Sequence, residues 1–405
     1  MSTAATDRQG GIEPATPGRL FLLVLVGVTA LGPMAMQMFI PAIPVIQKHF
    51  AVTPGTAQLT FSLSTFAMAV ATLIYGPLSD RFGRRPVILA GLAVYTAGTV
   101  LCFVSPNIWL LVIGRTVQAV GAAAGFVLAR AIVRDLFGRE RSAQMIAYLT
   151  MAMVVVPMVS PAVGGMMIET VGWRSIFVAG LAAGLLVTAG VLASLPETRS
   201  AAARSAGPGT LAAFGQLMAV PAFRGYALNA AFGMSVFFSF LAGAPFVVMN
   251  VFGLSAGEYG LLFIMVSAAF MVGNLITARL SARLGLDRLA VTGSCIALGF
   301  AASSALAMWG LGWSALALFV PMAGIAFGQG ISMPNVQAGA VSVDPQLAGA
   351  ASGLSGFTQM TMAAGFAQLV GVLQDGTPWP TVLAMLLCAV GALGTLLWGL
   401  RGGGR

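Results

Sequence analysis

Charged residues are scarce in this chain of 405 residues, where they make up only 8% of the sequence. Soluble domains carry about 25% charged residues, so the composition excludes an ordinary soluble domain. Hydrophobic residues account for 58% of the chain, and the mean hydropathy is +0.94. The sequence therefore predicts an integral membrane protein that contacts membrane lipids over much of its surface.

Histidine and cysteine are nearly absent as well. His49 is the single histidine, so no metal site or catalytic pair can be built around it. The three cysteines each fall inside an apolar run at unrelated spacings, which predicts neither a disulfide framework nor a metal site. We therefore expect no metal, no cofactor and no enzymatic activity, because a membrane enzyme needs a nucleophile or a metal cluster facing a cavity.

Carboxylates are few, and their positions are informative. All eleven acidic residues fall in predicted tails, loops or helix ends, so the sequence predicts no carboxylate deep among the membrane helices. They are Asp7, Glu13, Asp80, Asp135, Glu140, Glu169, Glu197, Glu258, Asp287, Asp344 and Asp375.

The net charge of +9 comes almost entirely from arginine. These arginines occur in short patches between apolar runs, not on a basic face, so we expect no nucleic-acid partner. If the N-terminus is cytoplasmic, nearly all basic residues fall in the tail and in loops on that side. The opposite side then keeps only Lys48 and Arg174, while Arg115 lies inside a helix. This bias predicts that both termini are cytoplasmic.

A window of about 20 residues, the length that crosses ~30 Å of hydrocarbon, predicts twelve membrane helices. A polar, Ala/Gly/Ser/Pro-rich stretch separates the sixth helix from the seventh. We therefore expect a cytoplasmic tail (1–18), a six-helix bundle (19–195), a cytoplasmic linker (196–223), a second six-helix bundle (224–400) and a second tail (401–405). The predicted helices span residues 19–45, 57–79, 86–105, 108–133, 142–169, 172–195, 224–250, 257–282, 287–308, 312–340, 346–373 and 377–400.

The loop between the second and third predicted helices reads "GPLSDRFGRR" (76–85) and concentrates charge in an almost uncharged chain. The segment "LSARLG" (280–285) echoes its "LSDRFG" (78–83) at the matching place in the second half. Two related six-helix halves are a plan of membrane transporters. A charged loop that only sets orientation remains the alternative. The candidate gating residues here are Gly76, Asp80, Arg81, Gly83, Arg84 and Arg85.

Several motifs together resemble the major facilitator superfamily, and within it the Bcr/CflA type of drug efflux carriers. "GPLSDRFGRRPVIL" (76–89), "GRTVQAVGAAAG" (114–125) and "SPAVGG" (160–165) resemble superfamily motifs. Closer to the Bcr/CflA group are "MFIPAIP" (38–44), "ARAIVRDLFGRE" (129–140), "GWRSIF" (172–177) and "LPETR" (195–199). These matches cover the first six helices.

The resemblance implies an all-α membrane protein with twelve transmembrane helices in two pseudo-symmetric six-helix bundles. It also implies a monomeric carrier of the bacterial inner membrane that exports small amphipathic molecules or drugs by alternating access, as a proton-coupled antiporter. A facilitated or uptake carrier without proton coupling and a membrane sensor that does not transport remain alternatives.

The resemblance further implies roles for the charged loop and for the fifth helix. Asp80 would hydrogen-bond the start of the eleventh helix near residues 344–346, and Arg84 would reach Asp135. Both contacts would form when the cytoplasmic side shuts and break when it opens. Prolines and glycines in the fifth helix favour a kink of the antiporter type, at Pro157, Pro161, Gly164 and Gly165.

Arg115 is the basic residue expected at membrane depth, where an arginine is costly and marks a functional site. Gln37 lies at a similar depth, where the Bcr/CflA pattern has an aspartate, which weakens the expectation of proton coupling and of cation recognition. An arginine satisfied by carbonyls and Gln37 alone is the structural alternative. Other candidate cavity residues, with packing as the alternative for each methionine and phenylalanine, are Gln118, Met34, Met38, Met151, Asn229, Phe232, Phe238, Gln329, Asn335 and Gln359.

Overall fold

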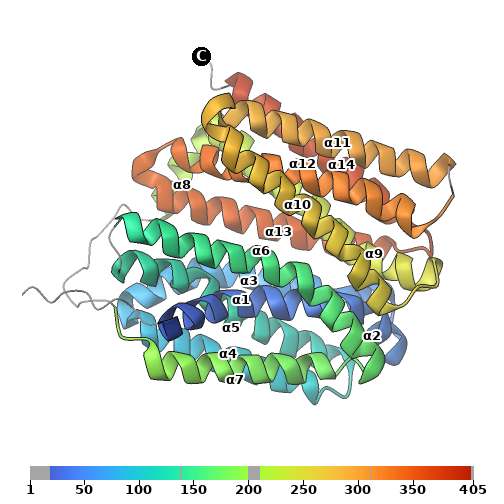
Figure 1. Ribbon diagram of the computed structural model, residues 1–405, viewed down its shortest axis with the longest axis horizontal. Coiled ribbons are helices and arrows are strands. Elements are labelled where there is room, and N and C mark those ends of the chain that lie inside the picture. Colours follow the sequence, from blue (N-terminus) through green and yellow to red (C-terminus); the bar gives the residue numbers. More distant parts are fainter. Residues whose placement is uncertain (1–18, 137–138, 199–209, 311, 403–405) are drawn as a thin grey trace, which may run out of the picture.

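The computed structural model describes residues 19–136, 139–198, 210–310 and 312–402, and within these ranges the chain is entirely helical. The predicted N-terminal tail, residues 403–405 of the C-terminal tail and residues 199–209 of the predicted linker lie outside the described residues. The helices lie roughly side by side in two groups that follow each other along the chain, the first half blue to green and the second yellow to red (Figure 1).

The N-terminal half begins with a helix that is interrupted where prolines recur. Pro41 and Pro44 lack the backbone N–H that continues an α-helix, and a short 3₁₀ turn separates α1 from α2 at this point. The elements of this half are α1 (Arg19–Phe39), η1 (Ile40–Ala42), α2 (Ile43–His49), α3 (Pro54–Phe82), α4 (Arg84–Phe103), α5 (Ile108–Leu136), α6 (Arg139–Thr170) and α7 (Ser175–Ser194).

The C-terminal half is preceded by a short helix inside the stretch predicted as a linker. This helix, α8 (Thr210–Ala219), buries Ala213 and Leu217 in the core of the second half. The remaining elements are α9 (Pro221–Phe246), the π-turn η2 (Val247–Val251), α10 (Ala256–Leu284), α11 (Leu286–Gly310), α12 (Ala315–Ser342), η3 (Pro345–Leu347), α13 (Ala348–Leu373) and α14 (Trp379–Gly402).

Ten stretches of helix among the described residues are long and apolar enough to cross a membrane, against the twelve predicted. The two predicted spans outside this count correspond to α6 and α13. In α6, the described apolar part is the shorter segment Val155–Thr170. Helix α13 is 26 residues long but rich in glycine, alanine, serine and threonine, which lowers its hydropathy. The prediction of an all-helical membrane protein is thus confirmed, while the count of twelve is not reached by this measure.

The buried side chains form three hydrophobic cores, and their distribution shows how the halves meet. One core contains residues of both halves, such as Phe61 of α3 and Phe238 of α9, whose ring centroids lie 5.5 Å apart. The second core belongs to the N-terminal half alone, and the third to the C-terminal half and α8. The shared core lies at the end of the molecule where α1 ends and α14 begins, which we call the closed end. The separate cores lie at the other end, which we call the tail end.

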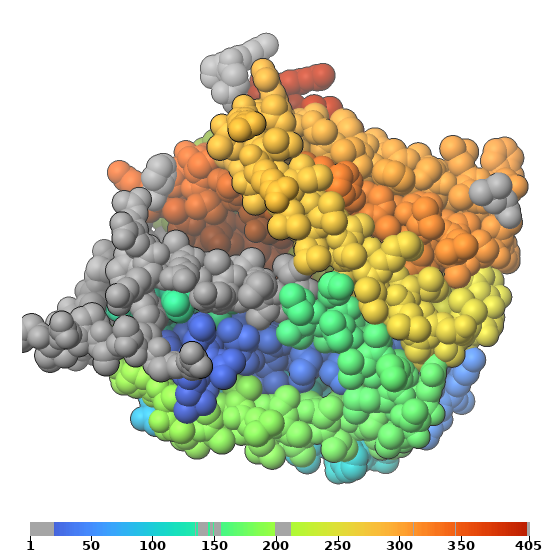
Figure 2. Space-filling model, viewed as in Figure 1, coloured from blue at the N-terminus to red at the C-terminus, as the bar shows by residue number. Residues whose placement is uncertain are grey.

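The space around the glycines shows the same difference between the closed end and the tail end. At the closed end, a Cβ added to Gly165 of α6 would lie 2.3 Å from the Ala256 carbonyl oxygen of α10, so the two halves touch backbone to backbone. Figure 2 shows the green surface of α6 meeting the yellow surface of α10 at this end. At the tail end, a Cβ added to Gly76 of α3, or to Gly349 or Gly353 of α13, would meet nothing within 4 Å. The halves are therefore packed together at one end and apart at the other.

Candidate functional site

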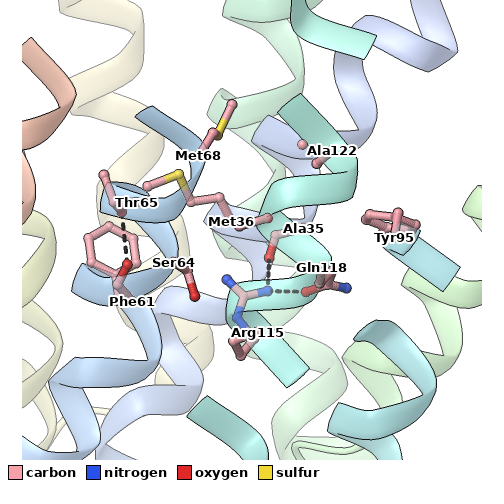
Figure 3. A pocket seen from close by; sticks show the side chains of 12 residues that line it. Ala35, Met36, Phe61, Ser64, Thr65, Met68, Tyr95, Arg115, Gln118 and Ala122 are labelled. Atoms are coloured by element: carbon pink, nitrogen blue, oxygen red, sulfur yellow. Dashed lines mark hydrogen bonds between the residues drawn. The ribbon is translucent and has the colours of Figure 1, made fainter. Parts of the chain in front are cut away.

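Arg115 lies about two turns after the start of α5, with only 4% of its surface exposed. Its Nη1 donates hydrogen bonds to Gln118 Oε1 at 2.5 Å and to the Ala35 carbonyl of α1 at 3.3 Å (Figure 3). Residues three apart share a helix face, so the sequence "RTVQ" itself places the glutamine beside the arginine. Gln118 in turn donates from Nε2 to the Thr99 hydroxyl of α4 at 2.8 Å. The arginine is therefore held by neutral oxygens of α1 and of its own helix, while Thr99 of α4 orients the glutamine.

A close contact between α4 and α5 positions this chain of hydrogen bonds. A Cβ on Gly98 would lie 2.3 Å from the backbone nitrogen of Gln118, and one on Gly121 would lie 2.2 Å from that of Tyr95. Only glycine permits the two backbones to approach this closely. The Thr99 hydroxyl is thereby brought within reach of Gln118.

Within the part of the chain that the structure describes, the positive charge of Arg115 has no acidic partner. Its guanidinium carbon lies 4.2 Å from the centroid of the Phe39 ring, an arrangement that stabilises a desolvated cation by about 2 kcal/mol. Its Nε has no hydrogen-bond partner. Among the described side chains, Arg115 is the only charged residue that is buried. The site therefore holds one uncompensated positive charge and one free donor.

Two adjoining pockets meet at Arg115 and Gln118, and both are lined by residues of the N-terminal half. The larger lies among α1, α3, α4 and α5, with polar groups from Ser64 and Thr65 (Figure 3). The smaller lies among α1, α5 and α7 and is lined by Met34 and Met38. Both are narrow in this state. Flexible, polarisable methionines suit a pocket that accepts ligands of different shapes.

Gln37 is buried, at 7% exposure, but it lines neither pocket, and its Oε1 has no hydrogen-bond partner. The α1 residues that line the smaller pocket are Met34, Ala35, Met38 and Phe39. Of the structural alternative, in which carbonyls and Gln37 satisfy Arg115, the structure contains the carbonyl contact, to Ala35, while Gln37 Oε1 makes no hydrogen bond.

The candidates from the second half line neither pocket and make hydrogen bonds or ring contacts of their own. Asn229 donates to Ser294 Oγ and to the Ala392 carbonyl. Gln329 donates to the Gly233 carbonyl at 2.7 Å. The side chain of Met151 lies outside the described residues. The others are buried or half-buried: Asn335 bonded to the Ile331 carbonyl, Gln359 to Ser355, Phe232 beside Phe366, and Phe238 beside Phe61.

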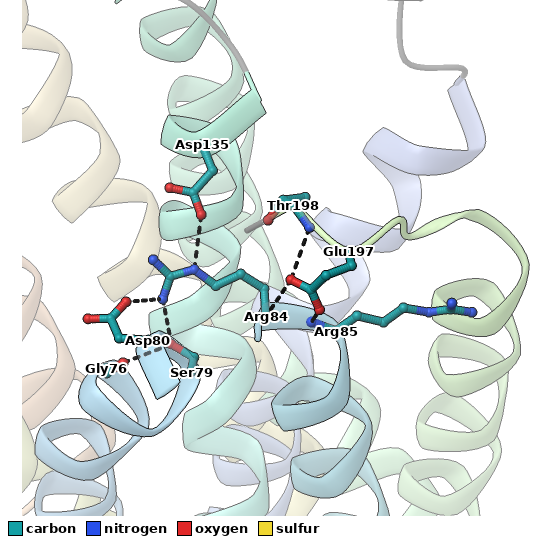
Figure 4. Close-up of polar contacts among 8 residues, drawn as sticks. All are labelled: Gly76, Ser79, Asp80, Arg84, Arg85, Asp135, Glu197 and Thr198. Atoms are coloured by element: carbon teal, nitrogen blue, oxygen red, sulfur yellow. Dashed lines mark hydrogen bonds and ion pairs between the residues drawn. The ribbon is translucent and has the colours of Figure 1, made fainter. Parts of the chain in front are cut away.

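The charged loop forms a second polar cluster, at the tail end (Figure 4). Arg84 Nε donates to Asp135 Oδ2 at 3.0 Å, and its Nη1 lies 3.0 Å from Asp80 Oδ1. The Arg84 to Asp135 contact is the one that the resemblance implies. It joins α4 to α5 within one half and is present although the halves have separate cores at this end. It is therefore not a contact that depends on the two halves meeting.

The remaining loop residues lie around this cluster. A Cβ on Gly76 would meet nothing within 4 Å, so this glycine makes no close helix contact in this structure. The N–H of Gln346 is bonded to the Asp344 side chain of its own turn. Arg81 is exposed beside Phe82, and Arg85 donates to the Leu192 carbonyl of α7 at 2.9 Å.

Glu197, which follows α7, is a functional residue that the sequence analysis did not select. Its two carboxylate oxygens accept the backbone N–H groups of Arg84 and Arg85 at 3.0 and 3.1 Å (Figure 4). These N–H groups open α4, whose N-cap, Gly83, has no side chain to serve them. Gly83 adopts φ +96° and a Cβ there would lie 2.6 Å from Glu197, so only glycine fits.

The fifth predicted helix corresponds to α6, which contains both prolines. Pro161 is buried, and Pro157 is half-buried. A Cβ on Gly164 would lie 2.4 Å from the Met38 carbonyl oxygen, while Gly165 touches α10. These glycines therefore set the contacts of α6 with the end of α1 and with the other half.

The family model described as Major Facilitator Superfamily matches residues 25–367. Multidrug resistance protein D of Escherichia coli (strain K12) is 31% identical over 386 residues, which cover 93% of this chain and 94% of that protein. The Bicyclomycin resistance protein homolog of Haemophilus influenzae is 28% identical over 378 residues, covering 92% of this chain and 94% of that protein.

Solved structures share the fold at low sequence identity. A bacterial homolog of the human lysosomal transporter Spinster, in an inward-facing and unoccupied conformation, superposes with a TM-score of 0.72 at 17% identity. The superposition covers 95% of each chain. The two-half architecture described above is thus the arrangement found in that transporter.

Proposed function

Because the chain belongs to the Major Facilitator Superfamily, whose members are transporters, we propose that it exports small amphipathic drugs from the bacterial cytoplasm by alternating access. The predicted resemblance to Bcr/CflA-type carriers is confirmed by the multidrug resistance and bicyclomycin resistance relatives. Their names support drug export as the activity of this chain, because they match it along nearly its whole length.

The observation that carries the proposal is the buried Arg115 at the junction of two pockets. Its uncompensated charge and its free Nε form a binding group for an acceptor atom of a substrate, and the methionines beside it accommodate varied apolar shapes. Removing a guanidinium from water costs several kcal/mol unless a partner compensates. Because Arg115 is already buried in the folded protein, a substrate acceptor that binds to it does not meet this cost again. Substrates are therefore neutral or acidic molecules with strong hydrogen-bond acceptors.

The arginine bias places the tail end of the molecule in the cytoplasm and the closed end towards the outside of the inner membrane. In this orientation the described state is open towards the cytoplasm, where an exporter loads its substrate. Transport then requires the closed end to open and the tail end to shut. The loop around Asp80 is the group available to fasten the tail end in that second state.

Proton-coupled antiport is the proposed energy source, with a facilitated or uptake carrier as the second candidate. The absence of any buried Asp or Glu among the described side chains favours the second candidate, because the carboxylate that usually exchanges protons is replaced by Gln37. If export is nevertheless proton-coupled, an exposed group such as Asp135, or the substrate itself, exchanges the protons.

A survival panel tests the function directly. An efflux-deficient bacterium that expresses the protein is challenged with antibiotics of different charge, and the R115A variant, at equal membrane abundance, is the matched control. Raised resistance to at least one drug, lost in R115A, is the expected result. Flux of that drug into inside-out vesicles then separates a carrier from a sensor that does not transport.

A further inference from the structure

Among the described residues, side chains form hydrogen bonds between the halves at two seams of the closed end. At the seam of α3 and α13, Gln368 of α13 donates from Nε2 to the Gly55 carbonyl at 3.0 Å and accepts from the Ser62 hydroxyl. At the seam of α6 and α10, Glu169 of α6 accepts the Gly257 N–H through Oε1 at 2.7 Å.

The contact of Glu169 satisfies a donor that its own helix leaves open. Helix α10 begins with a capping box, in which the Ser255 hydroxyl accepts from the Glu258 N–H and the Glu258 carboxylate accepts from the Ser255 N–H. The Gly257 N–H lies between these two and has no partner within the first turn of its helix. A carboxylate is the favoured group at a helix N-terminus, and here the other half supplies it.

The contact of Gln368 lies where the backbones of α3 and α13 come close together. A Cβ on Gly371 of α13 would lie 2.5 Å from Gln58 of α3, and one on Gly55 would lie 3.0 Å from Val372. The Gln368 side chain reaches across this seam with both of its polar atoms. A separation of the two helices breaks both hydrogen bonds together.

We propose that Glu169 and Gln368 are the two latches that hold the closed end shut, and that both release when this end opens during transport. The proposal goes beyond the export function, since it concerns the equilibrium between two states of the empty protein. It rests on the proposed function only for the assignment of the closed end to the outer side of the membrane. Each latch positions a helix and does not contact the substrate.

The test measures distances at both ends of the purified protein without a drug. In a background with the three cysteines replaced by alanine, one spin-label pair is placed at the closed end, at V104C and W309C. A second pair is placed at the tail end, at L20C and L284C. All four side chains are exposed and none belongs to a latch. Double electron–electron resonance then gives the ratio of the two states.

Removing a latch shifts this ratio towards the state in which the two halves separate at the closed end. Glu169 is exposed, so water screens its contact with Gly257, and we expect E169A and Q368A each to raise the open fraction about fivefold. The double variant E169A/Q368A shows about the product of the two effects. The tail-end distance shortens as the closed-end distance lengthens. A loss of structural order alone would broaden both distances without this reciprocity.

Two neighbouring residues supply matched controls. Asp375 is an acid at the same end, bonded to Thr377 of its own turn, and Gln374 donates to Thr381 within its own half. The variants D375A and Q374A keep the wild-type ratio. The proposal is overturned if the double variant keeps the wild-type distances at both ends, or if the controls shift the ratio as far as E169A and Q368A do.

Isosteric variants keep the test decisive if an alanine variant does not fold. E169Q removes the charge but keeps an acceptor oxygen, and Q368E replaces the donor that faces Gly55 with a second acceptor. Both shift the ratio in the same direction as the alanine variants, and unchanged distances in both contradict the latches. Because no drug is present, the absence of any drug resistance in the survival panel would overturn the export function and leave this result standing.

Discussion

Arg84 of α4 and Asp135 of α5 form an ion pair, Nε to Oδ2, of 3.0 Å within one half of the molecule. This pair is intact while the two halves are apart at the tail end. Any contact that fastens the halves together at this end must therefore come from a neighbouring group. Asp80, at the end of α3, is the carboxylate in this cluster with the larger exposed fraction, 52% of its side chain against 28% for Asp135.

We expect D80N to insert and fold normally but to transport poorly. The variant keeps the volume of the side chain and leaves Arg84 paired with Asp135, so the N-terminal half is preserved. It removes the charge that would favour the N-terminus of a helix from the other half, and a loss of about 1.4 kcal/mol there slows turnover about tenfold. The measurement is drug efflux at matched expression, with D375N as a control at the other end. Full activity of D80N would show that Asp80 does not fasten the tail end in the second state.

Glu197 is expected to stabilise the N-terminal half. E197A leaves two N–H groups at the start of α4 without their carboxylate, and the loss of such a cap costs about 1 kcal/mol. Thermal unfolding of the purified protein, followed by tryptophan fluorescence, therefore shows a lower midpoint for E197A. E197Q keeps two side-chain polar atoms at this place but loses the charge, and its midpoint lies between those of E197A and the wild type. An unchanged midpoint in E197A would show that water replaces the carboxylate without cost.

The parts of this molecule that a sequence predicts best are those that depend on composition alone. The apolar runs and their charged ends located most of the helices to within a few residues. Helix α13 is among the helices located in this way, although it is not one of the ten spans counted by hydropathy, because the small residues that let it pack against α3 also make it less apolar.

The direction in which a buried side chain points was not predictable in the same way. Gln37 and Arg115 were expected at similar depth, but depth does not fix the helix face, and the pocket is lined by Ala35 and Met38 instead. Glu197 lies more than 110 positions from the helix that it caps, so no local pattern links them. Contacts between distant segments require the fold itself.

Gly165 gives a steric test of the closed end. In G165A the new methyl group lies against the Ala256 carbonyl oxygen, which forces α6 and α10 apart and favours the open state of this end. The matched control is G299A on α11, where a Cβ meets nothing within 4 Å and alanine is favoured over glycine by about 0.5–1 kcal/mol. Resistance measured at equal expression falls in G165A and stays at the wild-type level in G299A. Equal resistance in both variants contradicts a tight seam at this position.

The energy source is tested with a protonophore in cells and in vesicles. If export is proton-coupled, the protonophore abolishes efflux, and addition of the drug to inside-out vesicles changes their internal pH. Because no described Asp or Glu is buried, D135N is the first variant to examine for the loss of this pH change. Efflux that continues without a pH gradient and without a membrane potential identifies facilitated diffusion.

The charge of Arg115 predicts which drugs are carried. Its guanidinium is always protonated, it is buried, and its partners are the neutral oxygens of Gln118 and Ala35. A neutral or acidic drug that presents an acceptor to the free Nε satisfies the site, whereas a lipophilic cation adds a second positive charge. R115K keeps the charge but loses the planar fork and the contact with Phe39, so we expect it to lower resistance to every transported drug.

Q118E is the complementary variant, because it places a carboxylate on the atom that already accepts from Arg115 at 2.5 Å. The new carboxylate neutralises the charge of Arg115 and so shifts selectivity towards cationic drugs. A change of ~1.4 kcal/mol in binding free energy corresponds to about a tenfold change in relative resistance. Q37D is the matched control, since Gln37 is equally buried but lines neither pocket, and its effect on selectivity is smaller. Strong resistance of the wild type to quaternary ammonium dyes, without resistance to neutral or acidic drugs, would show that the charge of Arg115 does not select the substrate.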